Sequence, residues 1–102
     1  MAGGWTLTQT KSCKVIFKET ANYCLSYIHN GCEFHVHCEV YNWKLSVMKE
    51  LYVEFAHLLE VASDMGFSEV WSVTPNPKFC LLFGGIDTNT NLAGCRVMYW
   101  EI

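Results

Sequence analysis

Polar and apolar residues alternate cleanly in the segment 33–41. One set of alternate positions is apolar, and the other carries polar groups or rings: Phe34, Val36, Cys38 and Val40 against Glu33, His35, His37, Glu39 and Tyr41. Successive side chains of a strand point to opposite faces of a sheet. The segment therefore predicts a strand with one buried face and one polar face.

The period then changes from two to that of a helix. Apolar residues recur three or four positions apart from Leu45 to Met65, at positions 48, 51, 52, 55, 58, 59 and 62 between them. This spacing predicts one long amphipathic helix over about residues 44–65. Asn42 is a candidate N-cap, and Gly66 stands where a helix takes its left-handed residue after the last turn.

Strands are predicted on both sides of this helix. β-branched and aromatic residues favour strands near 5–9, at 14–18, at 23–29, at 70–73 and at 95–102. Asn30-Gly31 is a typical hairpin turn, because both residues tolerate a positive φ. Pro77 after Asn76 predicts a short helix over about 77–83 that ends at Gly84. The polar run 87–94 predicts a loop or a hairpin turn.

Composition adds that the chain is one small folded domain. It has 102 residues, of which 51% are hydrophobic and 17% charged, and disordered chains show the opposite balance. Together with the order of elements, this predicts a single α+β domain over residues 1–102. No apolar run reaches the roughly 18–20 residues that a membrane span needs.

Charge and cysteine content narrow the class of protein further. The net charge is −3 and the seven Lys and Arg residues are scattered, whereas nucleic-acid binding usually requires a basic patch. The six cysteines lie mostly in apolar runs, and no secretory leader opens the sequence. We therefore expect reduced thiols in a cytoplasmic protein, without a membrane or nucleic-acid partner.

The second half of the chain resembles the core of the GNAT (Gcn5-related N-acetyltransferase) fold. A strand, a long helix ending in Met65-Gly66-Phe67, a second strand and a short helix that starts after Asn76 follow in the order of that family. The string MGFSEVWSVTPNPKF at residues 65–79 is similar to degenerate GNAT-like proteins carried by tailed phages. The resemblance covers residues 33–102 and implies a mixed, mostly antiparallel sheet, with acetyl-CoA as cofactor in active members.

Two departures from that family argue against an enzyme. Active members hold the cofactor pyrophosphate on a glycine-rich loop at the start of the long helix, where bare backbone N–H groups reach the phosphates. Residues 41–46 contain no glycine, and Trp43 adds bulk there. The family also often places a tyrosine as general acid at the end of the short helix, where this chain has Phe83.

A further departure from the family is the small number of residues before the segment that matches its fourth strand. Only about 32 residues precede it, and the helix pair that usually follows the first strand of the family does not fit. Without that pair, one face of the sheet is expected to be open.

Site candidates follow from the predicted strand and the resemblance. At period two, His35, His37 and Glu39 share one strand face, which suits a catalytic base, a metal site or a polar stripe that meets a partner. The stripe is the preferred interpretation, no metal site is predicted, and the candidate partner surface comprises Tyr23, His35, His37, Glu39 and Tyr41.

Cofactor candidates come only from the resemblance. Trp43 and Lys44 stand where the family holds acetyl-CoA, and Asn76 starts the short helix. The segment 74–78 could hold an anion at that helix start, but a capped turn with two prolines is the preferred interpretation.

These observations lead to one preferred function and two alternatives. The preferred hypothesis is a phage or mobile-element protein that binds a host or phage protein, for instance to inhibit a host defence system, inside the host cell and without a cofactor. The alternatives are an acetyl-CoA-dependent N-acetyltransferase and a virion component. A homodimer through the open face is a further expectation.

Overall fold

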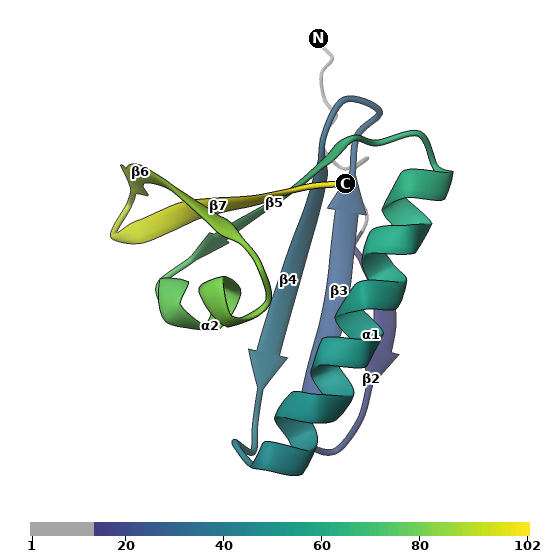
Figure 1. Cartoon of the computed structure of the whole chain (residues 1–102), viewed down its shortest axis with the longest axis vertical. Helices are drawn as coiled ribbons and strands as arrows, with labels where there is room; N and C mark the ends of the chain where they lie inside the picture. Colours follow the sequence, from purple (N-terminus) through teal and green to yellow (C-terminus); the bar gives the residue numbers. More distant parts are fainter. Residues whose placement is uncertain (1–13) are drawn as a thin grey trace, which may run out of the picture.

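The computed structural model describes residues 14–102, which form one mixed sheet with two helices (Figure 1). Its elements, in chain order, are β2 (Val15–Glu19), β3 (Tyr23–His29), β4 (Phe34–Val40), α1 (Leu45–Asp64), β5 (Glu69–Thr74), α2 (Pro77–Leu82), β6 (Ile86–Leu92) and β7 (Cys95–Glu101). The α+β class, the long helix and the short helix are confirmed. The strand expected near residues 5–9 lies outside the part that the structure describes.

Six strands form the sheet in the order β2-β3-β4-β5-β7-β6. Every neighbouring pair is antiparallel except β4 and β5, which run parallel and meet only at His35 and Trp71. Beyond that point the two strands diverge, as Figure 1 shows for the lower end of β4 and the left end of β5. The sheet therefore opens in its middle.

The alternation in β4 sorts its side chains as the sequence predicts. Phe34 and Val36 are buried, whereas His37 and Glu39 are exposed. The hairpin before β4 is closed by Asn30, whose Oδ1 accepts hydrogen bonds from the backbone N–H groups of Cys32 at 3.0 Å and Glu33 at 2.9 Å. Gly31 has the positive φ, 92°, that this turn requires.

The C-terminal cap of α1 follows the prediction, and its N-cap residue does not. Gly66 has φ 96°, its N–H donates to Ser63 O, and the N–H of Phe67 donates to Ala62 O, which is a Schellman motif. At the other end the N-cap position is Lys44, without a side-chain cap, so the prediction of Asn42 is wrong. Asn42 instead bonds to Asn22 in the turn between β2 and β3. Its backbone N–H donates to Asn22 O, and its side-chain amide donates to Asn22 Oδ1.

The buried stripe of α1 is rotated from the predicted one. Its buried residues are Val47, Leu51, Phe55, Leu58 and Ala62. Leu45 and Tyr52, both placed in the predicted stripe, are 71% and 57% exposed. Apolar positions run wider than one face of this helix, and the sheet selects which of them it covers. No helix in the described range is long and apolar enough to cross a membrane.

The polar run after α2 is a strand, so the prediction of a loop over 87–94 is wrong for most of it. β6 pairs with β7 at the edge of the sheet, with a register shift between Asp87 and Asn91. Arg96 on β7 holds this bulged strand, since its guanidinium donates to Asp87 Oδ2 at 2.8 Å and to Asn91 Oδ1 at 3.2 Å. An edge strand tolerates polar residues on both faces because neither face joins the core.

Both helices lie on the same face of the sheet (Figure 1). The core between them and the sheet contains the fully buried side chains of Leu25, Phe34, Leu51, Leu58, Val70 and Met98. Trp100 joins α2 to this core, because its Nε1–H donates to the carbonyl oxygen of Phe83 at 3.1 Å. In residues 14–102 no helix covers the opposite face, which we call the open face.

Candidate functional site

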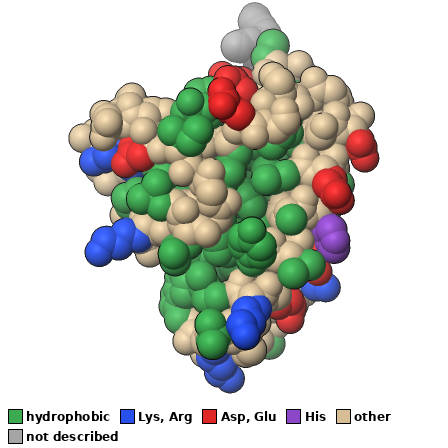
Figure 2. Space-filling view, viewed as in Figure 1, with side chains coloured by type: hydrophobic (Ala, Val, Ile, Leu, Met, Phe, Trp, Pro, Cys, Tyr) green, Lys and Arg blue, Asp and Glu red, His purple; other side chains and the backbone are tan. Residues whose placement is uncertain are grey.

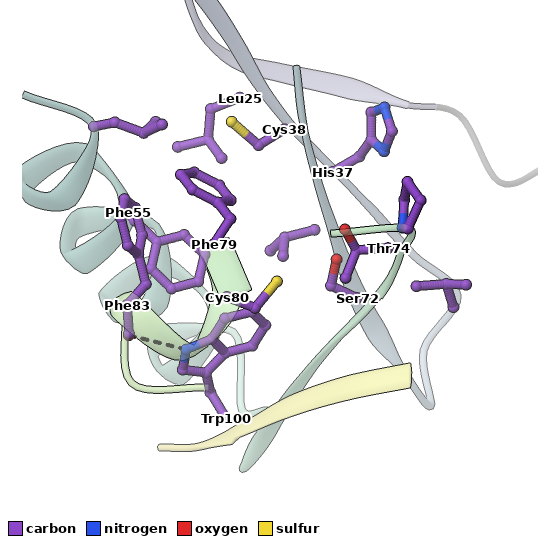
Figure 3. Close-up of a pocket in the computed structure, with 14 residues that line it drawn as sticks. Leu25, His37, Cys38, Phe55, Ser72, Thr74, Phe79, Cys80, Phe83 and Trp100 are labelled. Carbon is purple, nitrogen blue, oxygen red and sulfur yellow. Dashed lines mark hydrogen bonds between the residues drawn. The ribbon is translucent and has the colours of Figure 1, made fainter. Parts of the chain in front are cut away.

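A pocket lies where β4 and β5 diverge, between the sheet and the two helices. β4 contributes Val36 and Cys38, and β5 contributes Ser72 and Thr74. Figure 3 shows the rings of Phe55, Phe79, Phe83 and Trp100 on the helix side of this space. Its cavity volume is about 70 Å³, whereas ligand pockets of proteins typically measure roughly 300–1,000 Å³.

The pocket is filled by aromatic packing from the two helices. Phe79 and Phe83 of the α2 region have ring centroids 4.6 Å apart, and Phe83 lies 5.6 Å from Phe55 on α1. Phe55 in turn lies 4.8 Å from Trp100 on β7. These contacts join three elements and leave little free volume, so the pocket is part of the packed core.

Two thiols point into this apolar space. Burial raises the pKa of Cys38 to about 12 and that of Cys80 to about 11, because the pocket disfavours the charged thiolate. A thiol of such high pKa is a poor nucleophile at neutral pH. All five cysteines in residues 14–102 are free, as expected from the sequence.

Trp43 precedes the N-cap of α1 and packs against Phe79, one of the residues that line the pocket. Its ring packs edge-on against Phe79, with centroids 5.2 Å apart and planes at 87°. The contact connects the turn after β4 to α2. Lys44 and Asn76, the other two cofactor candidates, are exposed residues at the starts of the two helices.

The start of α1 does not fit the pyrophosphate of acetyl-CoA. The phosphate-binding backbone of the GNAT-type site needs close approach without side-chain bulk. Here Trp43 stands next to the N-cap of α1 and carries a large side chain whose ring packs against Phe79. Phe83, which stands where the family often has a tyrosine, packs on Tyr52 and Phe55.

His35 and His37 lie on the open face, as the alternation predicts. His35 Nε2 lies 3.0 Å from Glu33 Oε1, and its backbone pairs with Trp71 of β5. His37 lies at the rim of the pocket and points to the other side of β4 from Cys38 (Figure 3). The structure therefore brings His35 beside an aromatic residue of β5.

Trp71 and Tyr99 extend this surface, and sequence reasoning missed them. Their rings stack at 5.2 Å with planes 28° apart. Both residues face away from the helices, because their neighbours Val70 and Met98 fill the core on the other face. The signal was present in the sequence as alternation in 69–73 and 97–101, but it did not say which strands are neighbours.

Tyr23 does not belong to the open face, so its predicted placement there is wrong. It pairs with Val40 in the β3–β4 ladder and is only 1% exposed. Its hydroxyl donates to Glu50 Oε2 on α1 at 2.7 Å. Burial and this hydrogen bond to a carboxylate raise the pKa of Tyr23. Glu39 and Tyr41 are exposed at the lower end of β4.

The part of the chain that the structure describes holds no cluster of three or more His, Cys, Asp or Glu side chains with metal-binding geometry. His35 has the Glu33 carboxylate beside it, and Glu39 lies two residues beyond His37 on the same strand. Among the described residues, the contact between His35 and Glu33 is of the kind that orients a catalytic histidine, whereas no third ligand joins them.

Comparison with known proteins gives one structural relation. No protein-family model and no curated protein matches the sequence. Among solved structures, the crystal structure of the anti-CRISPR protein AcrVA5 matches with a TM-score of 0.63 and 16% sequence identity. The match covers 88% of this chain and 98% of that chain. AcrVA5 has a GNAT-like fold, and this chain shares its overall arrangement of elements.

Proposed function

We propose that this chain is a phage or mobile-element protein that inhibits a host defence system by binding a protein. The observation that carries the binding mode is the Trp43–Phe79 contact, which adds bulk beside the start of α1, where the GNAT family needs bare backbone to hold its cofactor. The kind of target is suggested by AcrVA5, which is an anti-CRISPR protein. Such a protein acts inside the host cell.

The open face is the proposed contact surface for this partner. It presents His35 beside Trp71, whose ring stacks on that of Tyr99, and His37 two residues further along β4. Ile16, 47% exposed, and Val73, 38% exposed, add apolar area. Aromatic side chains are enriched in the centres of protein interfaces. A second copy of the chain is the other occupant that this face suits.

An interference assay tests the function. Cells that carry a CRISPR–Cas system directed against a phage would produce this chain, and plaques would be counted. We expect the wild-type chain to restore plaques and the His35→Ala/His37→Ala variant to lose most of this effect. Truncating a central interface residue costs about 2 kcal/mol, roughly thirtyfold in affinity. His57→Ala, an exposed histidine on α1, is the matched control and should behave as wild type.

Thermal unfolding with acetyl-CoA separates binding from acetyl transfer. A ligand that binds the folded state must raise its apparent stability. We expect no shift in Tm, because the start of α1 is blocked by Trp43. A rise of several degrees, or acetylation of a host protein that depends on this chain, would replace the proposal with the acetyltransferase alternative. Sedimentation of the chain alone decides whether the open face joins two copies.

A further inference from the structure

The helix side of the molecule carries a second exposed apolar surface, between α1 and α2. We call it the helix patch and define it by Trp43, Leu45, Tyr52, Phe79, Leu82 and Phe83. Figure 2, which views this side, shows hydrophobic side chains running as a continuous band over the middle and lower part of the molecule. This band is separate from the open face on the opposite side of the sheet.

Exposure within the helix patch is high for such large side chains. Leu45 is 71% exposed, Leu82 70%, Tyr52 57% and Trp43 55%. Leu45 and Tyr52 lie seven residues apart on α1, so they share one stripe of the helix. Tyr52 packs edge-on against Phe83 at 5.7 Å, which places this stripe beside α2. Contiguous apolar area of this kind marks interaction sites.

Three lysines lie beside the helix patch. Lys44 precedes Leu45, Lys49 lies between Leu45 and Tyr52, and Lys78 is four residues before Leu82 on α2. None of the ion pairs in residues 14–102 uses these three lysines. In Figure 2, Lys and Arg side chains lie along the lower and left margins of the band.

The acidic side chains of α1 nearest to this region face the other way. Glu50 accepts the hydrogen bond of Tyr23, and Glu54 lies 3.8 Å from Lys18 of β2. Both contacts fall on the flank of α1 that faces β2 and β3. The flank that faces α2 therefore combines apolar side chains with uncompensated positive charge, although the whole chain has a net charge of −3.

We infer that the helix patch binds an acidic protein segment that carries apolar side chains. Apolar residues of that segment would cover Leu45, Tyr52 and Leu82, and its carboxylates would meet the bordering lysines. Charge complementarity of this kind sets orientation and speeds association. The inference rests on the proposed function only in taking the partner to be a protein.

Other occupants fit the patch less well. In a symmetric dimer through this surface, the same lysines of both copies would approach one another. Binding of single-stranded nucleic acid relies on a positively charged groove that follows the phosphate backbone, whereas this chain has a net charge of −3 and scattered Lys and Arg residues. A small anionic ligand would leave the apolar stripe uncovered.

Fluorescence anisotropy with a synthetic peptide of Glu, Leu and Phe, labelled with fluorescein, tests the inference on the full chain. We expect binding that weakens about tenfold or more for Tyr52→Ala/Leu82→Ala. Lys44→Gln/Lys49→Gln/Lys78→Gln should weaken binding and remove most of its salt dependence. Matched controls are Ile16→Ala, 47% exposed on the open face, and Lys14→Gln; both should bind as wild type. Circular dichroism confirms that each variant is folded.

Three results would overturn the inference: equal binding of a peptide with Gln in place of Glu, unchanged binding by the lysine variant, or stronger binding of phosphatidylserine vesicles or of an oligonucleotide. The assay contains no host component, so its outcome is separable from that of the proposed function. Peptide binding without restored plaques refutes only the proposed function. Restored plaques without peptide binding refute only the inference.

Discussion

At the scale of single residues, pairing register decided which predicted site residues share a face. Tyr23 and His37 are both ring-bearing strand residues in neighbouring strands. The β3–β4 ladder sets Ser26 opposite His37 and Tyr23 opposite Val40. Tyr23 therefore turns to the helices, because residues opposite one another in a ladder point to the same side. A shift of one residue would have reversed this result.

Removing the Tyr23 hydroxyl should destabilise the protein measurably. Tyr23→Phe deletes the 2.7 Å hydrogen bond to Glu50 and leaves the ring in the core. A hydrogen bond of this kind contributes about 1 kcal/mol net to the free energy of unfolding. Urea denaturation of the variant and of wild type measures this difference. Tyr41→Phe, at an exposed position, should unfold as wild type, and equal loss in both variants would contradict the assignment.

The orientation of the Trp43 ring depends on a neighbour that is distant in the sequence. The sequence places its bulk where a glycine-rich loop belongs in active GNAT-type proteins. It does not say where the ring points. Only the fold shows that the ring meets Phe79, a residue of another helix. The departure from the glycine-rich loop at Trp43 is thus accompanied by a packing contact with α2, with ring centroids 5.2 Å apart.

At the scale of elements, the end of α1 is fixed by local chemistry. Gly66 adopts a φ of 96°, and a Cβ placed on it would meet no atom within 4 Å. The glycine is therefore required for its backbone conformation and not for lack of space. This is why the sequence located the helix end to the residue.

Gly66→Ala should lower the free energy of unfolding by about 1–2 kcal/mol, the cost of a left-handed conformation for a residue with a Cβ. Thermal and urea unfolding measure the loss. Ser63→Ala, in the last turn of the same helix and exposed, is the control and should change stability by less than about 0.5 kcal/mol. Wild-type stability of the glycine variant would show that the Schellman motif does not hold this end.

β6 shows the reverse case, in which an element depends on distant residues. Its own residues, Asp-Thr-Asn-Thr-Asn, are typical of turns. The strand forms because β7 offers a free edge and because Arg96 bonds to side chains along it. Thr88 adds a hydrogen bond from its Oγ1 to Val97 O at 2.9 Å. The residues of β6 alone do not indicate that β7 and Arg96 will bind them.

At the scale of the whole molecule, the divergence of β4 from β5 creates an apolar pocket that holds two thiols. Burial raises the pKa of Cys38 from 9.0 to about 12 and that of Cys80 from 9.0 to about 11. The folded protein therefore keeps these protons at a pH where the unfolded chain releases them. Unfolding is favoured as the pH rises, and this stabilisation is complete only below about pH 9.

We expect the free energy of unfolding to fall between about pH 9 and the raised thiol pKa values. Denaturation at a series of pH values measures this slope. The Cys38→Ala/Cys80→Ala variant should be less stable at neutral pH, because it leaves a cavity, but should show a shallower slope. Cys32→Ala, at an exposed thiol, should keep the slope of wild type. An identical slope in the double variant would exclude these thiols as its source.

The sequence by itself determined the elements whose chemistry is local. It determined the strand alternation of β4, the extent of α1 and its glycine end, and the start of α2 at Pro77. Period, capping and proline geometry act within a few residues, so they can be recognised without knowledge of the fold.

The tertiary structure alone decided which of these elements meet. Pairing register buried Tyr23, joined Trp71 and Tyr99 to the histidine face, and made a strand of β6. The packing of α1 on the sheet left Leu45 and Tyr52 exposed beside α2. Surfaces for partners consist of residues far apart in the chain, and the contacts that bring them together come from the packing of the whole core.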